Sequence, residues 1–317
     1  RVWSATANPC ATHPDDYHVT FAPDKAEYRR TDGDIETRTE IAVSPEDDVE
    51  IRRVIISNRG MKPRVIDVTS YFEIAMTAQA ADQAHKSFSN LFVETEALPD
   101  TNAILFSRRP RSSEEARVWG FHALACEASE ECAWSYETDR AGFIGRLHSV
   151  NDPFAVREGG ALSDTVGAVL DPSCSVRKSV TIQPGSSARL IFTTGVAAER
   201  AEAIRLIEIH HDIRSGQRAI DLAWTAAQIE LRDLGISPEG AVTLERLASR
   251  LLLTDPYSPL KIETPVENGL PISGLWSIGI SGDHPILLVR VDQLEHGPLV
   301  RHALLAHEYW RHKGLVS

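Results

Sequence analysis

Apolar and polar side chains alternate along much of the first two-thirds of the chain, and this period of two predicts β-strands. The pattern is clearest between Ile35 and Val43, where every second side chain is charged (Glu36, Arg38 and Glu40). Turn residues such as Gln183–Gly185 separate the runs. The predicted strands are Ile35–Val43, Val49–Ser57, Arg64–Ile74, Ala103–Ser107, Val118–Cys126, Cys132–Thr138, Ser175–Ile182 and Ala188–Gly195. Many short strands joined by turns predict a large β-sandwich or a barrel.

Near Ala197 the pattern changes to one that favours helices, with apolar residues at helical spacing. The predicted helices are Glu199–Ile213, Gln217–Leu234 after a break at Ser215-Gly216, a third from Ser237 to Leu253, and Pro298–Lys313. Thr254–Pro271 carries four prolines and is predicted to be an extended linker. We therefore expect a sandwich over residues 1–196, a helical linker over 197–258, and the start of a second helical domain over 259–317.

Composition and charge exclude several classes of partner. Acidic residues outnumber basic ones 45 to 33, giving a net charge of -12, which argues against a nucleic-acid partner. No apolar run reaches the roughly 18 residues that a membrane-spanning helix needs, so we expect no membrane contact by this segment. Four cysteines without a CxxC pair fit a reducing, cytoplasmic location. The chain opens at Arg1 without Met, and we expect it to be part of a longer protein.

Three short motifs resemble known sites but fail on spacing. His307 and His312 are five residues apart, whereas two zinc-binding histidines on one helical face need a spacing of four. Ser281 is followed directly by Gly282, so Gly-x-Ser-x-Gly is not formed. The acidic turn Glu46–Asp48 is typical of a solvated loop rather than a calcium site. No P-loop or GxGxxG is present, and we predict neither a metal nor a nucleotide site.

Five stretches, in order along the chain, resemble one family. They are Ile35–Asn58 (IETRTEIAVSPEDDVEIRRVIISN), Ser89–Glu96 (SNLFVETE), Ser135–Arg146 (SYETDRAGFIGR), Ser273–Val291 (SGLWSIGISGDHPILLVRV) and Ala306–Leu315 (AHEYWRHKGL). These stretches are similar to bacterial cyclic β-1,2-glucan synthases and the related disaccharide and oligoglucan phosphorylases of glycosyltransferase family 36. The resemblance implies a galactose-mutarotase-like β-supersandwich, a helical linker and the opening of an (α/α)6 barrel.

The resemblance also implies a reaction, inverting phosphorolysis or glycosyl transfer on a β-glucan oligosaccharide. Inorganic phosphate would be the co-substrate and attack the anomeric carbon, so one carboxylic acid suffices and no other cofactor is implied. In the family that acid lies in a Trp-Asn-Asp-Gly string, which this sequence lacks, so we expect no catalytic residue in this chain. By resemblance we further expect a homodimer and the cytosolic part of an inner-membrane enzyme.

The candidate substrate-binding residues are Trp276, Ser281, Asp283 and Arg146. An aromatic face stacks on a sugar ring, and planar polar groups bond to sugar hydroxyls. Alternatively, Asp283 would cap a helix beginning at Pro285, and Arg146 would belong to a surface set of ion pairs such as Asp139 with Arg140. The other tryptophans of the sandwich and linker (Trp3, Trp119, Trp134 and Trp224) are predicted to lie in the core.

Two alternative functions remain open from the sequence. The chain could be a non-catalytic carbohydrate-binding or scaffold module. It could also be a mutarotase, which needs a His and a Glu facing each other in the sandwich cleft, and His122 and Glu137 are the available residues.

Overall fold

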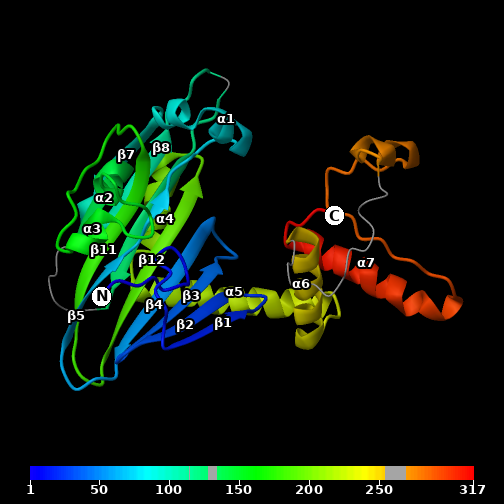
Figure 1. Ribbon diagram of the computed structural model, residues 1–317, viewed down its shortest axis with the longest axis horizontal. Coiled ribbons are helices and arrows are strands. Elements are labelled where there is room, and N and C mark those ends of the chain that lie inside the picture. Colours follow the sequence, from blue (N-terminus) through cyan, green and yellow to red (C-terminus); the bar gives the residue numbers. More distant parts are fainter. Residues whose placement is uncertain (114, 128–133, 254–268) are drawn as a thin grey trace. The chain divides into compact units, whose positions relative to one another are not determined.

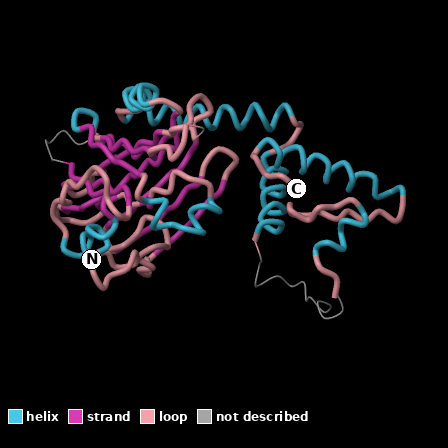
Figure 2. Tube along the Cα trace, turned by 90° about the horizontal axis from the view of Figure 1, so that it is seen from above, coloured by secondary structure: helices cyan, strands magenta, loops and turns pink. Residues whose placement is uncertain are grey.

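The computed structural model describes residues 1–113, 115–127, 134–253 and 269–317. The chain forms two compact units, Arg1–Ala226 and Ala227–Ser317. Strands are gathered in the first unit, and the second consists of helices and loops (Figures 1 and 2). Among the described residues, no helix combines the length and the apolar character that crossing a bilayer requires.

The larger sheet of the first unit holds eight strands, all paired antiparallel. In spatial order they are β1 (Asp16–Phe21), β2 (Ala26–Asp32), β3 (Ile35–Val43), β4 (Val49–Asn58), β12 (Ser187–Ala197), β9 (Trp119–Cys126), β8 (Ala103–Arg108) and β7 (Val93–Leu98). The smaller sheet is ordered β10 (Trp134–Asp139), β11 (Pro172–Ile182) and β5 (Arg64–Thr69), with β6 (Phe72–Glu73) also paired to β11.

The two sheets pack face to face and bury a common core. Inward side chains such as Val54, Leu124, Phe192 and Val176 meet between them, as the alternating sequence pattern requires. The predicted β-sandwich is therefore confirmed. The start of the predicted strand at Cys132 lies outside the described residues, and the sequence pattern missed β1, β2 and β7.

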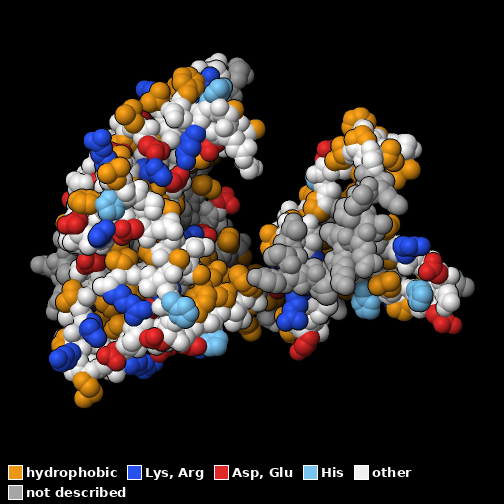
Figure 3. Space-filling model, viewed as in Figure 1, with side chains coloured by type: hydrophobic (Ala, Val, Ile, Leu, Met, Phe, Trp, Pro, Cys, Tyr) orange, Lys and Arg blue, Asp and Glu red, His pale blue; other side chains and the backbone are white. Residues whose placement is uncertain are grey.

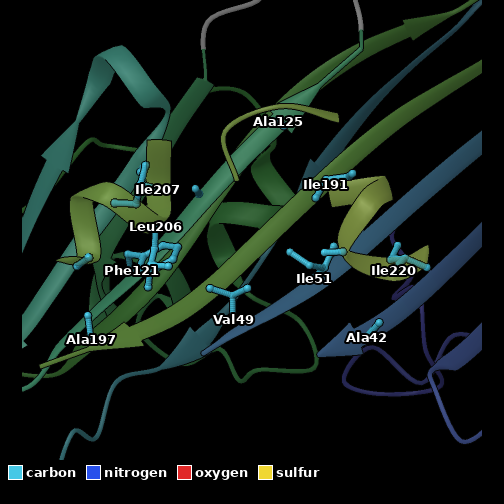
Figure 4. Packing of buried hydrophobic residues seen from close by; sticks show 14 of the residues in the cluster. Ala42, Val49, Ile51, Phe121, Ala125, Ile191, Ala197, Leu206, Ile207 and Ile220 are labelled. Atoms are coloured by element: carbon cyan, nitrogen blue, oxygen red, sulfur yellow. The ribbon is translucent and has the colours of Figure 1, made fainter. Parts of the chain in front are cut away.

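Helices cover the other face of the larger sheet. Leu206 and Ile207 of α4 (Arg200–Ile209) and Ile220 of α5 (Ile213–Asp233) pack among strand residues such as Phe121 and Ile51 (Figure 4). Many of the strand residues on this face are apolar, among them Val49, Ile51, Leu105 and Phe121.

The predicted helix break at Ser215-Gly216 is wrong. α4 ends at Ile209, and Asp212 accepts a hydrogen bond from the Ser215 backbone N–H at 2.7 Å, which fixes the start of α5. Gly216 lies inside α5 because the helix passes close to the sheet there: a Cβ at this position would lie 2.5 Å from Ile191 Cδ1.

Short helices lie in the connections between strands of the sandwich. They are α1 (Gln79–Asn90), a 3-10 turn at Pro99–Thr101, α2 (Arg140–Ile144) and α3 (Phe154–Glu158). Trp3, Trp119 and Trp134 pack against the two cores as predicted, whereas Trp224 is 56% exposed on α5, so its predicted core position is wrong.

The second unit contains the end of α5, α6 (Pro238–Leu252), 3-10 turns at Ile272–Ile278 and Leu294–His296, and α7 (Gly297–His312). Trp310 and Tyr309 of α7 are buried, and their polar atoms reach α6: Trp310 Nε1 donates to the Leu244 carbonyl at 3.0 Å, and Tyr309 Oη donates to Glu245 Oε1 at 3.0 Å. Most of the predicted linker Thr254–Pro271 lies outside the described residues. The opening of an (α/α)6 barrel stays a prediction.

Candidate functional site

Three of the four predicted binding residues lie together in one loop of the second unit. The 3-10 turn Ile272–Ile278 carries Trp276, whose Nε1 donates to the Ser281 carbonyl at 3.1 Å. The Asp283 backbone N–H donates to Ser281 Oγ at 3.3 Å. Gly282 has a φ of +79°, and a Cβ there would lie 2.6 Å from the Ile272 side chain, so the tight return of this loop requires glycine. We call residues 272–283 the tryptophan loop.

The tryptophan loop presents side chains that solvent can reach. Trp276 is 64% exposed, and Ser281 and Asp283 are exposed. The predicted helix at Pro285 is wrong, since residues 285–292 form no helix and α7 begins only at Gly297. Asp283 therefore caps no helix in this loop, and its carboxylate remains available for a ligand.

Arg146 belongs to the first unit and follows α2, where it is exposed. A surface ion pair of Arg140 is present as predicted, but its partners are Glu73 and Asp171 rather than Asp139. Asp139 caps α2 by accepting a hydrogen bond from the Ala141 N–H at 3.0 Å, and Arg140 instead donates to Glu73 Oε1 at 2.8 Å. The hydrogen bond and charge of Glu73 raise the pKa of Arg140.

His122 and Glu137, the residues a mutarotase would need, have separate environments. His122 is 2% exposed, and its ring nitrogens lie 2.8 Å from Thr194 Oγ1 and 2.8 Å from Ser70 Oγ. Burial and then the charge of Arg52 lower its pKa to about 3, so the imidazole is neutral. A neutral ring with both nitrogens engaged ties β9 to β12 and to the residue after β5.

Glu137 is also buried, but elsewhere. Its carboxylate accepts hydrogen bonds from Ser163 Oγ, Thr165 Oγ1 and the Asp139 backbone N–H, all from its own strand and the loop before β11. Glu137 does not line the cavity that His122 lines. The structure does not bring the two together, which removes the geometric basis of the mutarotase alternative.

A cavity of about 490 Å³ lies on the inner face of the larger sheet, the face toward the smaller sheet. The cavity is also lined by the β5 residues Val65–Thr69 of the smaller sheet and by residues of the N-terminal segment, among them Trp3. The lining combines hydroxyl, charged and aromatic groups, including Thr37 and Thr39 of β3, Arg52 of β4, Thr194 of β12, and Trp3. The sequence analysis did not assign these residues to a site.

A second hollow, of about 940 Å³, runs along α5 beside the ends of β9 and β12. Several of its charged groups have partners within the fold. Arg189 pairs with Glu127 at 3.2 Å, and Asp221 accepts a hydrogen bond from Gln217 at 2.8 Å. On the face in view in Figure 3, acidic and basic side chains are likewise interspersed over the sandwich unit. The part of the chain that the structure describes holds no group of three or more His, Cys, Asp or Glu side chains arranged to bind a metal.

Comparison with known proteins gives the family. The family model of the glycosyl hydrolase 94 supersandwich domain matches residues 1–213. The chain is 34% identical over 316 residues to a cyclic beta-(1,2)-glucan synthase, NdvB, of Rhizobium meliloti (strain 1021). The match covers 99% of this chain but only 11% of that relative's length.

Two solved structures match part of the chain at low sequence identity. A bacterial glucoamylase complexed with acarbose matches 67% of this chain and 28% of its own, with 10% identity and a TM-score of 0.42. A family GH92 inverting mannosidase from Bacteroides thetaiotaomicron matches 68% of this chain and 23% of its own, with 12% identity and a TM-score of 0.30. The two packed sheets, the helix-covered face and the match over residues 1–213 agree, and the chain belongs to the glycosyl hydrolase 94 family, of which it carries the supersandwich domain.

Proposed function

We propose that this chain belongs to an enzyme that processes β-1,2-glucan by inverting phosphorolysis or glycosyl transfer. The observation that carries the proposal is the 34% identity, over 316 residues, to a protein named a cyclic beta-(1,2)-glucan synthase. Inorganic phosphate would be the co-substrate and nucleophile, and a carboxylic acid that this chain does not supply would protonate the leaving oxygen. The enzyme would act in the cytoplasm as a homodimer.

In this proposal the chain itself holds the glucan. The indole of Trp276 offers a face that can stack on the apolar side of a pyranose ring. Asp283 and Ser281 supply an acceptor and a hydroxyl on the same loop, where sugar hydroxyls could bond. Arg146 is an exposed guanidinium that could bond to phosphate or to sugar hydroxyls in a bidentate manner.

Isothermal titration calorimetry with sophorose and longer β-1,2-linked oligosaccharides tests this role. We expect Trp276→Ala to weaken binding by about three- to tenfold, the worth of one aromatic stacking contact. Trp224→Ala is the matched control because Trp224 has similar exposure, 56% against 64%, and belongs to no proposed site. Equal affinity for β-1,2- and β-1,4-linked oligosaccharides would contradict the proposed substrate.

The chemistry is tested on the same chain with oligosaccharide and phosphate. We expect no glucose 1-phosphate, because the chain lacks the Trp-Asn-Asp-Gly string of the family acid. Release of glucose 1-phosphate by this chain would show that it contains its own proton donor. It would overturn the proposal that the catalytic acid is not in this chain.

The alternative of a purely non-catalytic binding or scaffold module predicts the same binding. It differs in predicting that a longer form of the protein, one that includes the acid string, also forms no product. Product formation by that longer form would exclude it.

A further inference from the structure

The face of the larger sheet that lines the cavity carries two aromatic rings farther out, Phe21 and Tyr28. Opposite residues of paired antiparallel strands project to the same face. Thr39 of β3 pairs with Tyr28 of β2, and Ile41 is linked in the same way through Ala26 to Phe21 of β1. Thr39 and Ile41 line the cavity, so Tyr28 and Phe21 lie on the same face, one and two strands farther out.

Phe21 and Tyr28 form an edge-to-face pair with ring centroids 6.3 Å apart. Phe21 is 66% exposed, although most phenylalanine side chains in folded proteins are buried. Two contacts of the N-terminal segment lie at the other end of the β1–β2 pair. The Ala7 N–H donates to Tyr17 Oη, and Arg1 pairs with Asp32. The aromatic pair therefore lies on the same face of the sheet as the cavity, on the strands next to its β3 wall.

The cavity also holds a polar group that the fold leaves without a partner. Thr39 is 4% exposed, and its Oγ1 makes no hydrogen bond among the described residues. A buried hydroxyl without a partner is destabilising, so such groups are uncommon unless a ligand satisfies them. The threonine hydroxyl is therefore a second and independent indication of a ligand.

Two of the charged side chains that line the cavity already have hydrogen-bond partners within the fold. Arg52 Nε donates to Glu50 Oε1 at 2.5 Å, so its charge is matched on the same strand. Arg177 is buried and already donates to Thr69 Oγ1 and to the carbonyls of Gly160 and Ala155. A volume of about 490 Å³ is in the range of small-molecule sites, and hydroxyls beside aromatic rings are complementary to a sugar.

We propose that the cavity and the Phe21–Tyr28 pair form a binding site for a neutral gluco-oligosaccharide, separate from the tryptophan loop. The rings would stack on a pyranose at the mouth, and Thr39 Oγ1 would bond to a sugar hydroxyl inside. The choice of a β-1,2-linked glucan as the ligand rests on the proposed function, whereas the site itself rests on the geometry above.

The test is calorimetry with β-1,2-linked oligosaccharides on the whole 317-residue chain, two test variants and one control variant. Phe21→Ala removes an exposed ring, so the fold should be retained, and Phe88→Ala is its matched control because Phe88 is 50% exposed on α1. Thr39→Val keeps the shape and removes only the hydroxyl. We expect about three- to tenfold weaker binding for Phe21→Ala and for Thr39→Val, and no change for Phe88→Ala.

Thermal unfolding of Thr39→Val separates a binding role from a structural one. Removing an unpartnered buried hydroxyl should leave the melting temperature unchanged or raise it, while affinity falls. A lower melting temperature with unchanged affinity would mean that the hydroxyl serves the fold, and would overturn the proposal.

The remaining outcomes separate this site from the proposed function. Binding that survives Phe21→Ala and Thr39→Val but is lost in Trp276→Ala overturns the cavity site and leaves the proposed function intact. Binding that is lost in Phe21→Ala and Thr39→Val, but is equally tight for β-1,4-linked sugars, supports the site and overturns β-1,2-glucan as the substrate. No binding of any sugar at millimolar concentration overturns the site.

Discussion

Replacing Glu40 by glutamine should destabilise the sandwich unit more than any exposed charge replacement. Glu40 is fully buried on β3, on the side of the sheet that α4 and α5 cover. Its carboxylate accepts hydrogen bonds from Lys25 Nζ at 2.6 Å, Arg53 Nε at 2.7 Å and Arg38 Nη2 at 3.1 Å. Three cations therefore share this carboxylate. Arg38 and Lys25 also pair with Glu27, at 2.8 Å and 4.0 Å, and Arg53 also donates to Gln217 of α5.

The magnitude follows from what glutamine keeps and what it loses. Removing one partner of a buried ion pair costs about 3–5 kcal/mol. Glutamine retains one acceptor oxygen, worth about 1 kcal/mol. The cations are not fully buried, with Arg38 at 35% and Lys25 at 24% side-chain exposure, so water recovers part of their solvation. We expect a net loss of about 2–3 kcal/mol, which lowers the melting temperature of a unit of this size by roughly 5–10 °C.

The assay is urea unfolding followed by circular dichroism of the β-sheet, at several pH values. Burial raises the pKa of Glu40, but hydrogen bonds from Lys25 and Arg53 outweigh it, so the pKa lies below its usual value. A lowered folded-state pKa gives stability that is present above the unfolded pKa of about 4.3 and lost as pH falls through the folded value. The gap between wild type and Glu40→Gln should therefore close in acid.

Glu36→Gln is the control. Glu36 lies on the same strand but is 38% exposed and pairs with Arg59, which is 66% exposed, at 2.9 Å. We expect its loss to cost less than about 1 kcal/mol. Equal stability of Glu40→Gln and Glu36→Gln, or a gap that does not change with pH, would refute the reasoning.

Three further outcomes follow from the packing. Gly120→Ala should cost about 1–3 kcal/mol, because its Cβ would lie 2.2 Å from the Phe106 ring, and thermal melting measures the loss. His122→Gln should flatten the pH dependence of unfolding: since the folded pKa of His122 is lowered to about 3, wild type loses up to about 1.4 kcal/mol per pH unit as pH falls from about 6.5. Trp310→Phe should lower the stability of the second unit by about 1–2 kcal/mol through its lost hydrogen bond to Leu244 O and lost packing, seen as faster hydrogen exchange in α6 and α7.

Hydrophobic alternation predicted most of the sandwich because most inward positions are Val, Ile, Leu or Phe. It missed β1 and β2 for a physical reason. On β2 two of the inward side chains are Arg30 and Asp32, which are 1% and 6% exposed and bond to each other at 2.5 Å. Because the inward residues of β2 include a buried ion pair, a pattern of apolar residues alone does not predict that this strand has a buried face.

The helix break shows a second limit of local reasoning. Glycine is a poor helix former, so Ser215-Gly216 predicts an interruption. In the structure Gly216 has no Cβ, which lets α5 approach Ile191 on the sheet, and tertiary packing outweighs the local propensity. The contact between Gly216 of α5 and Ile191 of β12 can be seen only in the folded structure, because the two residues are far apart in the sequence.

The tryptophan loop could be found from the sequence because its residues are adjacent, whereas the cavity could not. Its walls come from β3, β4, β12 and the N-terminal segment, and the register that joins them is set by long-range pairing. The inward threonines of β3 nevertheless leave a signal in the pattern. A hydroxyl such as that of Thr39 costs about 1–3 kcal/mol when buried without a partner, so a valine would suit a purely structural strand better. An inward threonine without a partner is therefore less favourable for stability than a valine at the same position. If its hydroxyl binds a ligand, Thr39→Val should weaken binding, and calorimetry measures that loss.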